Sequence, residues 1–310
     1  MSEPSVAIVS KQANAYADAL ATSLTTAPLT FTETPAASAL AEVPVVLADP
    51  DLIAPLVPRL PDLRWLQSTW AGVTPLIRQP ARHYQLTNIR GVFGPLMVEY
   101  VFGHLLAIER QHRDHYHATR QQRWHPVEPG VLRGKTLGLM GMGSIGTALA
   151  EAGRFFGLTV LGYSRSGGAH PTLERAYCQG QLAEMLPHCD YLVASLPSTL
   201  ATRNQLDGEA FSVLKPGAVL INVGRGNLID EEALIQALGS GRLRAAVVDV
   251  FRQEPLPSSH PLWQTPNLLV TSHTAAPSRV ADIAPIFIDN YHRFSAGMPL
   301  LHRVDFERGY

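Results

Sequence analysis

The chain has 310 residues, which at about 150 residues per domain predicts two domains. Hydrophobic residues make up 46% and charged residues 16% of the sequence, a balance that supports a large core and excludes a disordered or membrane-embedded class. With 25 basic and 26 acidic residues the net charge is −1, so the composition favours neither a nucleic acid nor a membrane surface as partner.

From the sequence we expect neither a secretory leader nor a membrane span. Residues 1–10 lack the basic flank, apolar core and small-residue cleavage site of a secretory signal, and no run of about 18 apolar residues occurs anywhere. Cys178 and Cys189 are the only cysteines, too few for a disulfide framework or a four-ligand zinc site. We therefore expect a cytoplasmic protein.

Apolar runs of strand length form two series along the chain. The first lies between Val6 and Gly91 and consists of residues 6–9, 45–48, 65–68 and 84–87. Residues 95–124 follow, with few helix breakers, as one long helix or two in tandem. The second series consists of residues 136–140, 158–163, 191–195, 218–222, 245–249 and 268–271. Helical stretches between most of these runs predict an α/β protein with doubly wound parallel sheets. The final apolar helix, near residues 280–294, can bring the chain back to pack on the first domain.

A glycine-rich turn follows the first strand of the second series. Glycines at positions 141, 143 and 146 stand in the spacing GxGxxG, directly before a helix that begins at Ser144. The first glycine permits a tight turn, the second a close approach of a pyrophosphate, and the third close packing of helix on strand. A merely tight turn has the same pattern, but the strand before it and the helix after it favour a dinucleotide site at Gly141, Met142, Gly143, Ser144 and Ile145.

Three polar residues, Arg225, Glu254 and His273, follow three successive strands of the second series. Ligands of open parallel sheets bind at the carboxyl ends of the strands, so we expect these side chains to meet in one crevice. The set suits the reduction of a 2-oxo acid: Arg225 can bind a carboxylate with two parallel donors, His273 can protonate the carbonyl oxygen, and Glu254 can stabilise the imidazolium. Taken singly, each has a plain alternative as a surface charge, a turn residue before Pro255, or one of 12 histidines.

Four segments in order, residues 137–164, 214–226, 249–257 and 272–276, resemble the D-isomer-specific 2-hydroxyacid dehydrogenase family. The resemblance implies two Rossmann-like domains, with a nucleotide domain of residues 99–285 inserted into a split substrate domain of residues 1–98 and 286–310. It also implies a homodimer and catalytic roles for Arg225, Glu254 and His273. Further cofactor contacts are implied at Leu196, Pro197, Asn222, Val223, Gly224, Asp249 and Ala275.

In the first domain, residues 67–73 resemble the family's glycine-rich loop, whose backbone amides hold the substrate carboxylate. Besides Arg225 and His273, substrate contacts are therefore expected at Trp70, Ala71, Gly72 and Val73. Trp70 is bulky where the family usually has a small residue, and Thr74 stands where Asp is common. We expect Trp70 to narrow the pocket, the alternative being a tryptophan of the core.

The second strand of the nucleotide domain is followed by Ser164, Arg165 and Ser166, and no acidic residue lies between Glu151 and Glu174. An acidic residue about 20 positions beyond the glycine turn usually binds the adenosine ribose and would repel a 2′-phosphate. Two hydroxyls and a guanidinium instead favour a phosphate, unless Arg165 points into solvent. The sequence therefore predicts NADP(H) as the preferred cofactor, with NAD(H) as the second candidate.

Histidines 112, 115, 117 and 125 crowd the polar half of the region 95–126. No cysteine or paired carboxylate completes a ligand set, so we predict no metal site and a solvated or subunit-facing stretch. The apolar first half and the polar, aromatic second half predict a homodimer built on this region. By resemblance, Trp124 reaches the substrate pocket of the partner.

The predicted activity is NAD(P)H-dependent reduction of a small 2-oxo acid to the D-2-hydroxy acid. Residues 95–99, 124–126 and 164–166 are similar to the glyoxylate/hydroxypyruvate reductase branch, which favours glyoxylate or hydroxypyruvate. Two alternatives stay open. One is a reductase for a larger D-2-hydroxy acid, and the other is a cofactor-sensing protein like the transcriptional corepressors of this fold family, which resemble the enzymes at the three catalytic positions.

Overall fold

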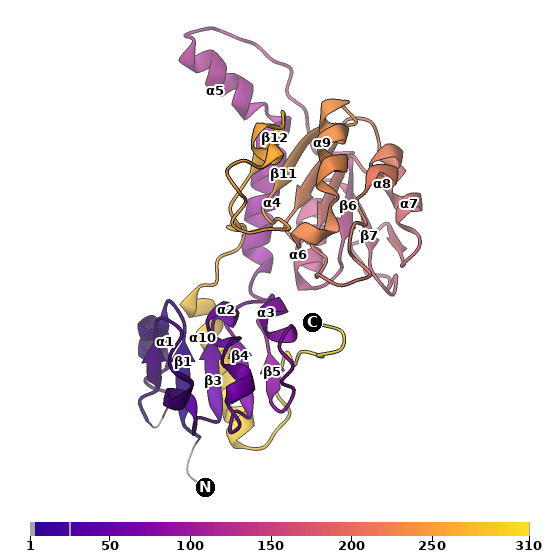
Figure 1. The fold of residues 1–310 in the computed structure, drawn as a ribbon. Coiled ribbons are helices and arrows are strands. Elements are labelled where there is room, and N and C mark those ends of the chain that lie inside the picture. The colour runs from indigo at the N-terminus through magenta and orange to yellow at the C-terminus, as the bar shows by residue number, and fades with distance from the viewer. Residues whose placement is uncertain (1–3, 25, 310) are drawn as a thin grey trace. The chain divides into compact units, whose positions relative to one another are not determined.

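A computed structural model describes residues 4–24 and 26–309 and divides them into two compact units, each built on its own sheet (Figure 1). Residues 1–3 of the segment considered for a leader lie outside the described residues. The terminal unit runs up to Val92 and resumes at Pro277, and the central unit spans Phe93–Ala276. The first boundary precedes the predicted 98/99 because the first long helix of the central unit already begins at Gly94. The second precedes the predicted 285/286 because the helix that begins at Val280 lies wholly in the terminal unit.

Five parallel strands form the sheet of the terminal unit in the order β2-β1-β3-β4-β5. The strands are β1 (Val6–Val9), β2 (Leu29–Phe31), β3 (Val45–Ala48), β4 (Trp65–Ser68) and β5 (Gln85–Thr87). The α-helices are α1 (Ala13–Leu20), α2 (Pro50–Ile53), α3 (Thr74–Ile77) and α10 (Val280–Ser295). Helix α10 comes from the far end of the chain and stacks Phe287 on Trp65, with ring centroids 5.1 Å apart. Both ends of the chain therefore build this unit.

Seven parallel strands form the sheet of the central unit in the order β12-β11-β10-β9-β6-β7-β8. Counted from β8, the first six have the order 3-2-1-4-5-6 of dinucleotide-binding domains, in which the strand order reverses between β6 and β9. The strands are β6 (Thr136–Met140), β7 (Thr159–Tyr163), β8 (Arg175–Tyr177), β9 (Tyr191–Ala194), β10 (Ala218–Asn222), β11 (Leu243–Val248) and β12 (Leu268–Val270). The α-helices are α4 (Gly94–Glu109), α5 (His112–Arg120), α6 (Ser144–Phe155), α7 (Leu182–Met185), α8 (Gly208–Val213) and α9 (Glu231–Gly239).

Helices cover both faces of the central sheet, which explains its uninterrupted apolar strands. Along β10, Val219 and Ile221 belong to the cluster formed with α4 and α6. The alternating residues Ala218 and Leu220 belong to the opposite cluster, formed with α8 and α9. The layered α/β architecture predicted from the sequence is confirmed.

Two local features differ from, or refine, the expected elements. The edge strands β2 and β8 were not predicted, because each has three residues, most of them exposed or half-buried. The region 95–124 forms two helices, and the break falls at Gln111, whose φ of 53° is left-handed. None of the helices in the described chain is long and apolar enough to cross a bilayer.

Candidate active site

The structure brings the predicted catalytic side chains together at one edge of the central sheet. Arg225, Glu254 and His273 follow β10, β11 and β12, which are neighbours in the sheet. His273 Nδ1 lies 2.7 Å from Glu254 Oε2, and the backbone N–H of Phe251 donates to Glu254 Oε1 over 2.8 Å. Both oxygens of the glutamate are therefore occupied, and Nε2 of the histidine is left to face a ligand.

Electrostatics favour the charged form of both members of this pair. The hydrogen bond to Glu254, which outweighs burial, raises the pKa of His273. Burial alone would raise the pKa of Glu254, but the bonds from His273 and Phe251, with the charges of His273 and Arg225, hold that pKa below its usual value. Burial lowers the pKa of Arg225, yet a guanidinium stays charged throughout the range in which proteins are folded. The site thus presents a guanidinium and a carboxylate, together with a histidine whose protonated form the carboxylate favours.

Asp249 fixes the turn that carries His273. Its side chain is 1% exposed, and its carboxylate accepts hydrogen bonds from the backbone N–H groups of Thr274 (2.9 Å) and Ala275 (3.1 Å). The N–H of His273 donates to the backbone oxygen of Asp249 over 2.9 Å. These bonds hold His273 at a φ of 56°, which costs a residue with a side chain about 1 kcal/mol or more. A cofactor contact of Asp249 or Ala275 stays a prediction.

The structure adds two residues to this network that the sequence did not point to. Thr271 donates from its hydroxyl to Asp249 Oδ1 over 2.6 Å, and the hydroxyl of Tyr100 lies 2.7 Å from Thr271 Oγ1. Since the single proton of Thr271 goes to Asp249, Tyr100 is the donor in its own bond. Burial raises the pKa of Tyr100 to about 12, so this proton is retained. A continuous hydrogen-bond chain therefore connects α4 to the turn of His273.

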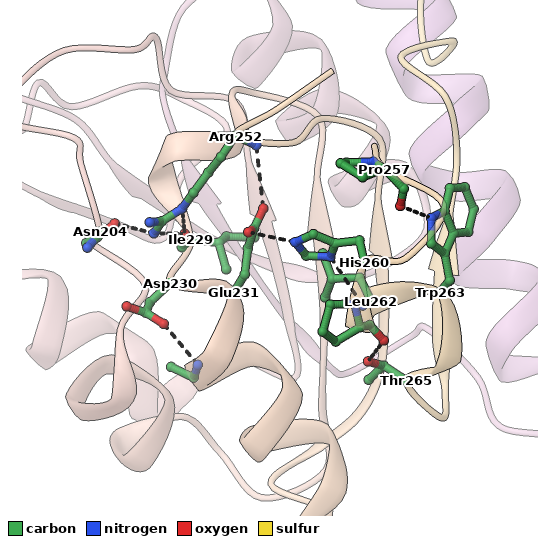
Figure 2. Close-up of polar contacts among 12 residues, drawn as sticks. Asn204, Ile229, Asp230, Glu231, Arg252, Pro257, His260, Leu262, Trp263 and Thr265 are labelled. Atoms are coloured by element: carbon green, nitrogen blue, oxygen red, sulfur yellow. Dashed lines mark hydrogen bonds and ion pairs between the residues drawn. The ribbon is translucent and has the colours of Figure 1, made fainter. Parts of the chain in front are cut away.

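The segment that carries Glu254 is anchored beside the start of α9 (Figure 2). Arg252 donates from Nε and Nη2 to the backbone oxygen of Ile229, at 3.2 and 2.6 Å. His260 Nε2 lies 3.5 Å from a carboxylate oxygen of Glu231. These contacts hold the chain on both sides of Glu254.

Arg225 is presented by a turn that Asn222 closes. The side chain of Asn222 is fully buried, donates to the backbone oxygen of Arg225 over 3.2 Å and accepts from the N–H of Gly224 over 3.1 Å. Gly224 approaches Leu196 so closely that a Cβ would lie 2.8 Å from its backbone oxygen. The predicted cofactor residues Val223 and Pro197 lie in the same two turns, after β10 and β9, on the edge that carries Arg225.

The glycine turn after β6 has the geometry expected of a phosphate-binding turn. Gly141 has a φ of 108°, and a Cβ on Gly146 would lie 2.0 Å from the backbone oxygen of Gly141. No heavy atom lies within 4 Å of a Cβ built on Gly143, so its backbone is open to a ligand. Helix α6 begins at Ser144 without a side-chain cap, which leaves its first N–H groups without a side-chain acceptor. A pyrophosphate fits these features.

The turn after β7 carries the residues predicted to choose the cofactor. Ser164 is half-buried, while Arg165 and Ser166 are exposed. Ser164 Oγ accepts a hydrogen bond from the N–H of Gly167 over 3.1 Å, and the N–H of Gln179 lies 3.5 Å from the backbone oxygen of Arg165. The turn is therefore shaped by its own backbone, and it lies beside the glycine turn because β6 and β7 are paired.

The loop predicted to bind the substrate carboxylate lies in the terminal unit, between β4 and α3. Trp70 is half-buried, so it is not a core residue, and its N–H donates to Ser68 Oγ over 2.9 Å. No group in the described chain accepts a hydrogen bond from the N–H of Ala71, Gly72 or Val73. Three adjacent unpaired amides are a feature of anion-binding loops.

The comparisons with known proteins agree with these features. Residues 102–275 match the family model described as D-isomer specific 2-hydroxyacid dehydrogenase, NAD binding domain. A protein named glyoxylate/hydroxypyruvate reductase A from Salmonella heidelberg (strain SL476) is 32% identical over 217 residues, 70% of this chain and 70% of its own length.

Two solved structures cover nearly the whole chain. A D-isomer specific 2-hydroxyacid dehydrogenase family protein from Aeromonas salmonicida has a TM-score of 0.92 and 41% identity, covering 98% of this chain and 100% of that chain. An NADPH-dependent glyoxylate/hydroxypyruvate reductase from Sinorhizobium meliloti, solved with NADP and sulfate, has a TM-score of 0.87 and 29% identity, covering 99% of this chain and 100% of that one.

Proposed function

Because the chain belongs to the D-isomer specific 2-hydroxyacid dehydrogenase family, and is thus an NAD(P)-dependent oxidoreductase, we propose that it reduces a small 2-oxo acid with NADPH. Glyoxylate and hydroxypyruvate are the proposed substrates, and the product is the 2-hydroxy acid, of D configuration where C2 is chiral. The observation that carries this proposal is the 2.7 Å contact between His273 and Glu254 at the sheet edge shared with Arg225.

Each side chain has one task. Arg225 binds the substrate carboxylate through two parallel N–H donors. His273, held at Nδ1 by Glu254, gives a proton from Nε2 to the carbonyl oxygen, where negative charge develops during reduction. Glu254 keeps the imidazole protonated and in place. The unpaired amides of Ala71, Gly72 and Val73 stay a predicted set of carboxylate donors.

The glycine turn would hold the pyrophosphate of NADP(H), and Ser164, Arg165 and Ser166 would bind its 2′-phosphate. When bound, this cofactor supplies the hydride. The complex of the Sinorhizobium meliloti reductase with NADP supports the choice of cofactor.

The substrate class is tested by NADPH oxidation with 2-oxo acids of increasing side-chain size. We expect kcat/KM to be highest for glyoxylate or hydroxypyruvate and to fall with branched and aromatic side chains. A Trp70→Ala variant should accept the larger acids better if Trp70 narrows the pocket. A parent protein that prefers phenylpyruvate would favour instead the reductase for larger acids.

Replacement of Glu254 by glutamine is expected to move the alkaline limb of the pH profile to lower pH. The carboxylate raises the pKa of His273, so its loss lowers that pKa, and the proton donor is then lost at a lower pH. The measurement is kcat/KM for reduction across the pH range, with Glu209→Gln, an exposed glutamate of α8, as the matched control. An alkaline limb that stays in place would show that Glu254 does not control the proton on His273.

We expect the parent protein to prefer NADPH over NADH by roughly 10–150-fold in kcat/KM, the effect of about 1.5–3 kcal/mol from charge-assisted bonds to the 2′-phosphate. Arg165→Ala should reduce this ratio mainly by raising the KM for NADPH. Arg154→Ala, an exposed arginine of α6, should leave the ratio unchanged. Equal use of both cofactors by the parent, or the same ratio in the Arg165 variant, would contradict the assignment.

We propose that residues 95–126 form the interface of a homodimer. Helix α5 stands away from the sheet of the central unit (Figure 1), and Ala118 is its one buried residue. Tyr116 is 63% and Trp124 is 94% exposed, so α5 and the segment after it present two large aromatic side chains that a partner could cover. Light scattering should report twice the 33.7 kDa of one chain. A double variant, Tyr116→Arg with Trp124→Arg, should be monomeric. The control Met298→Ser, which changes an exposed apolar residue outside the proposed interface, should stay dimeric. A mass of 33.7 kDa for the parent protein in solution would refute the interface.

A further inference from the structure

A basic hollow of about 400 Å³ lies in the terminal unit, apart from the residues assigned above. Arg64, Arg82, His83 and Arg303 line it together with Gln85 and Phe294. Arg64 directly precedes β4 and Gln85 begins β5, so the hollow lies at the amino ends of these two strands. The loop of residues 70–73 follows the carboxyl end of β4, roughly 13 Å away along a four-residue strand. The hollow and the predicted carboxylate loop are therefore separate.

The charges of this hollow are not compensated by the protein. None of the seven described residues that line it is acidic. Across the described chain, no carboxylate lies within 4.0 Å of Arg64, Arg82 or Arg303, so no ion pair offsets the charge that these three side chains place on one concave surface. Like charges that share one concave surface repel each other, and a bound anion would relieve that repulsion.

Two of the guanidinium groups are held in place before any ligand arrives. Arg82 donates to the backbone oxygens of Ala81 (2.7 Å) and Ile77 (2.9 Å), and its Cζ lies 4.7 Å from the ring centroid of Phe306. The Cζ of Arg64 lies over the ring of Phe294, 5.4 Å from its centroid. Arginines stacked on aromatic rings lose less side-chain entropy on binding than freely moving ones. The remaining donors of Arg64 and Arg303 are available to a ligand.

The other lining groups add hydrogen-bonding capacity. His83 Nε2 lies 2.9 Å from the backbone oxygen of Leu60, so this nitrogen carries a proton and Nδ1 remains as an acceptor in the neutral ring. Tyr84 also lines the hollow, but its hydroxyl is buried, so the donors open to a ligand are those of the arginines.

We propose that this hollow binds the phosphate group of a small phosphate monoester. Several arginine donors converging from different elements suit a tetrahedral dianion, which accepts hydrogen bonds on three oxygens. A volume of about 400 Å³ exceeds what a bare ion needs and lies in the range of small-molecule sites, and the mostly polar lining suits a short, hydroxylated organic part. The site lies wholly within the terminal unit and is independent of the proposed reductase activity.

The test is calorimetric titration of the full chain with glycerol 3-phosphate and, separately, inorganic phosphate, at an ionic strength kept constant with sodium chloride. We expect the ester to bind more tightly than phosphate, and the double variant Arg64→Gln, Arg303→Gln to weaken it tenfold or more. Arg175→Gln, which removes a paired exposed arginine of the central unit, should bind like the parent.

Melting temperatures of the unliganded proteins show whether the double variant is folded, and the two single variants repeat the test if it is not. The proposal is overturned if the parent binds neither probe, or if a folded double variant binds the ester as tightly as the parent. Binding of inorganic phosphate alone would identify an ion site and overturn the ester assignment.

Discussion

Replacing His273 by alanine is expected to lower kcat/KM for glyoxylate reduction by about 10²–10⁴-fold, the usual contribution of a general acid. The imidazole is 55% exposed and contacts Glu254 through Nδ1, so it contributes little to the core and its removal should leave the fold intact. Kinetics at saturating NADPH, with a melting curve for each protein, measure the effect.

His188→Ala is the matched control, since this exposed histidine of the central unit lies outside the site. It should retain the parent kcat/KM. If the His273 variant reduced glyoxylate as fast as the parent, another group would have to donate the proton, and the assignment of the whole site would be wrong.

Replacing Arg225 by glutamine should lower kcat/KM by about 10²–10³-fold. Two charge-assisted hydrogen bonds to a carboxylate are worth about 3–4 kcal/mol in a largely buried site, and glutamine keeps neither the charge nor the fork of donors. The effect should appear mainly in the KM for the 2-oxo acid, because the carboxylate is bound in both the ground state and the transition state. Arg225→Lys should recover only part of the loss, since an ammonium cannot bind a carboxylate with two parallel donors.

The KM for NADPH separates this role from a general loss of the site. It should stay near the parent value in Arg225→Gln, and Arg308→Gln, an exposed arginine paired with Asp305, should resemble the parent throughout. A rise in the KM for NADPH without a change in the KM for the 2-oxo acid would mean that Arg225 binds the cofactor rather than the substrate.

The sequence indicated the strands of both sheets wherever they are buried on two faces. Residues 136–140 and 218–222 have the same bounds in the structure, because strands covered by helices on both faces are built almost entirely from apolar residues. The edge strands β2 and β8 carry no such pattern, since half of their environment is solvent. The break between α4 and α5 falls at Gln111, where no glycine or proline marks it.

The candidate site also contains residues that the sequence indicates and residues that only the structure reveals. Arg225, Glu254 and His273 could be predicted because each follows a strand that the apolar pattern reveals. Tyr100 and Thr271 could not, because their importance comes from a hydrogen-bond chain to Asp249 that joins segments far apart in the sequence. For Asp249 the sequence suggested a cofactor contact, which stays a prediction, and the structure adds that its buried carboxylate supports the turn of His273.

The proposal that this chain is a working reductase, and not a cofactor-sensing protein of the same fold, is tested most directly by product stoichiometry. The purified chain is incubated with NADPH and glyoxylate, and NADPH loss and glycolate formation are measured in the same reaction. We expect one glycolate for each NADPH oxidised, and no turnover by His273→Ala on the same time scale. Tight binding of NADPH without turnover of glyoxylate, hydroxypyruvate or any larger 2-oxo acid would contradict the account.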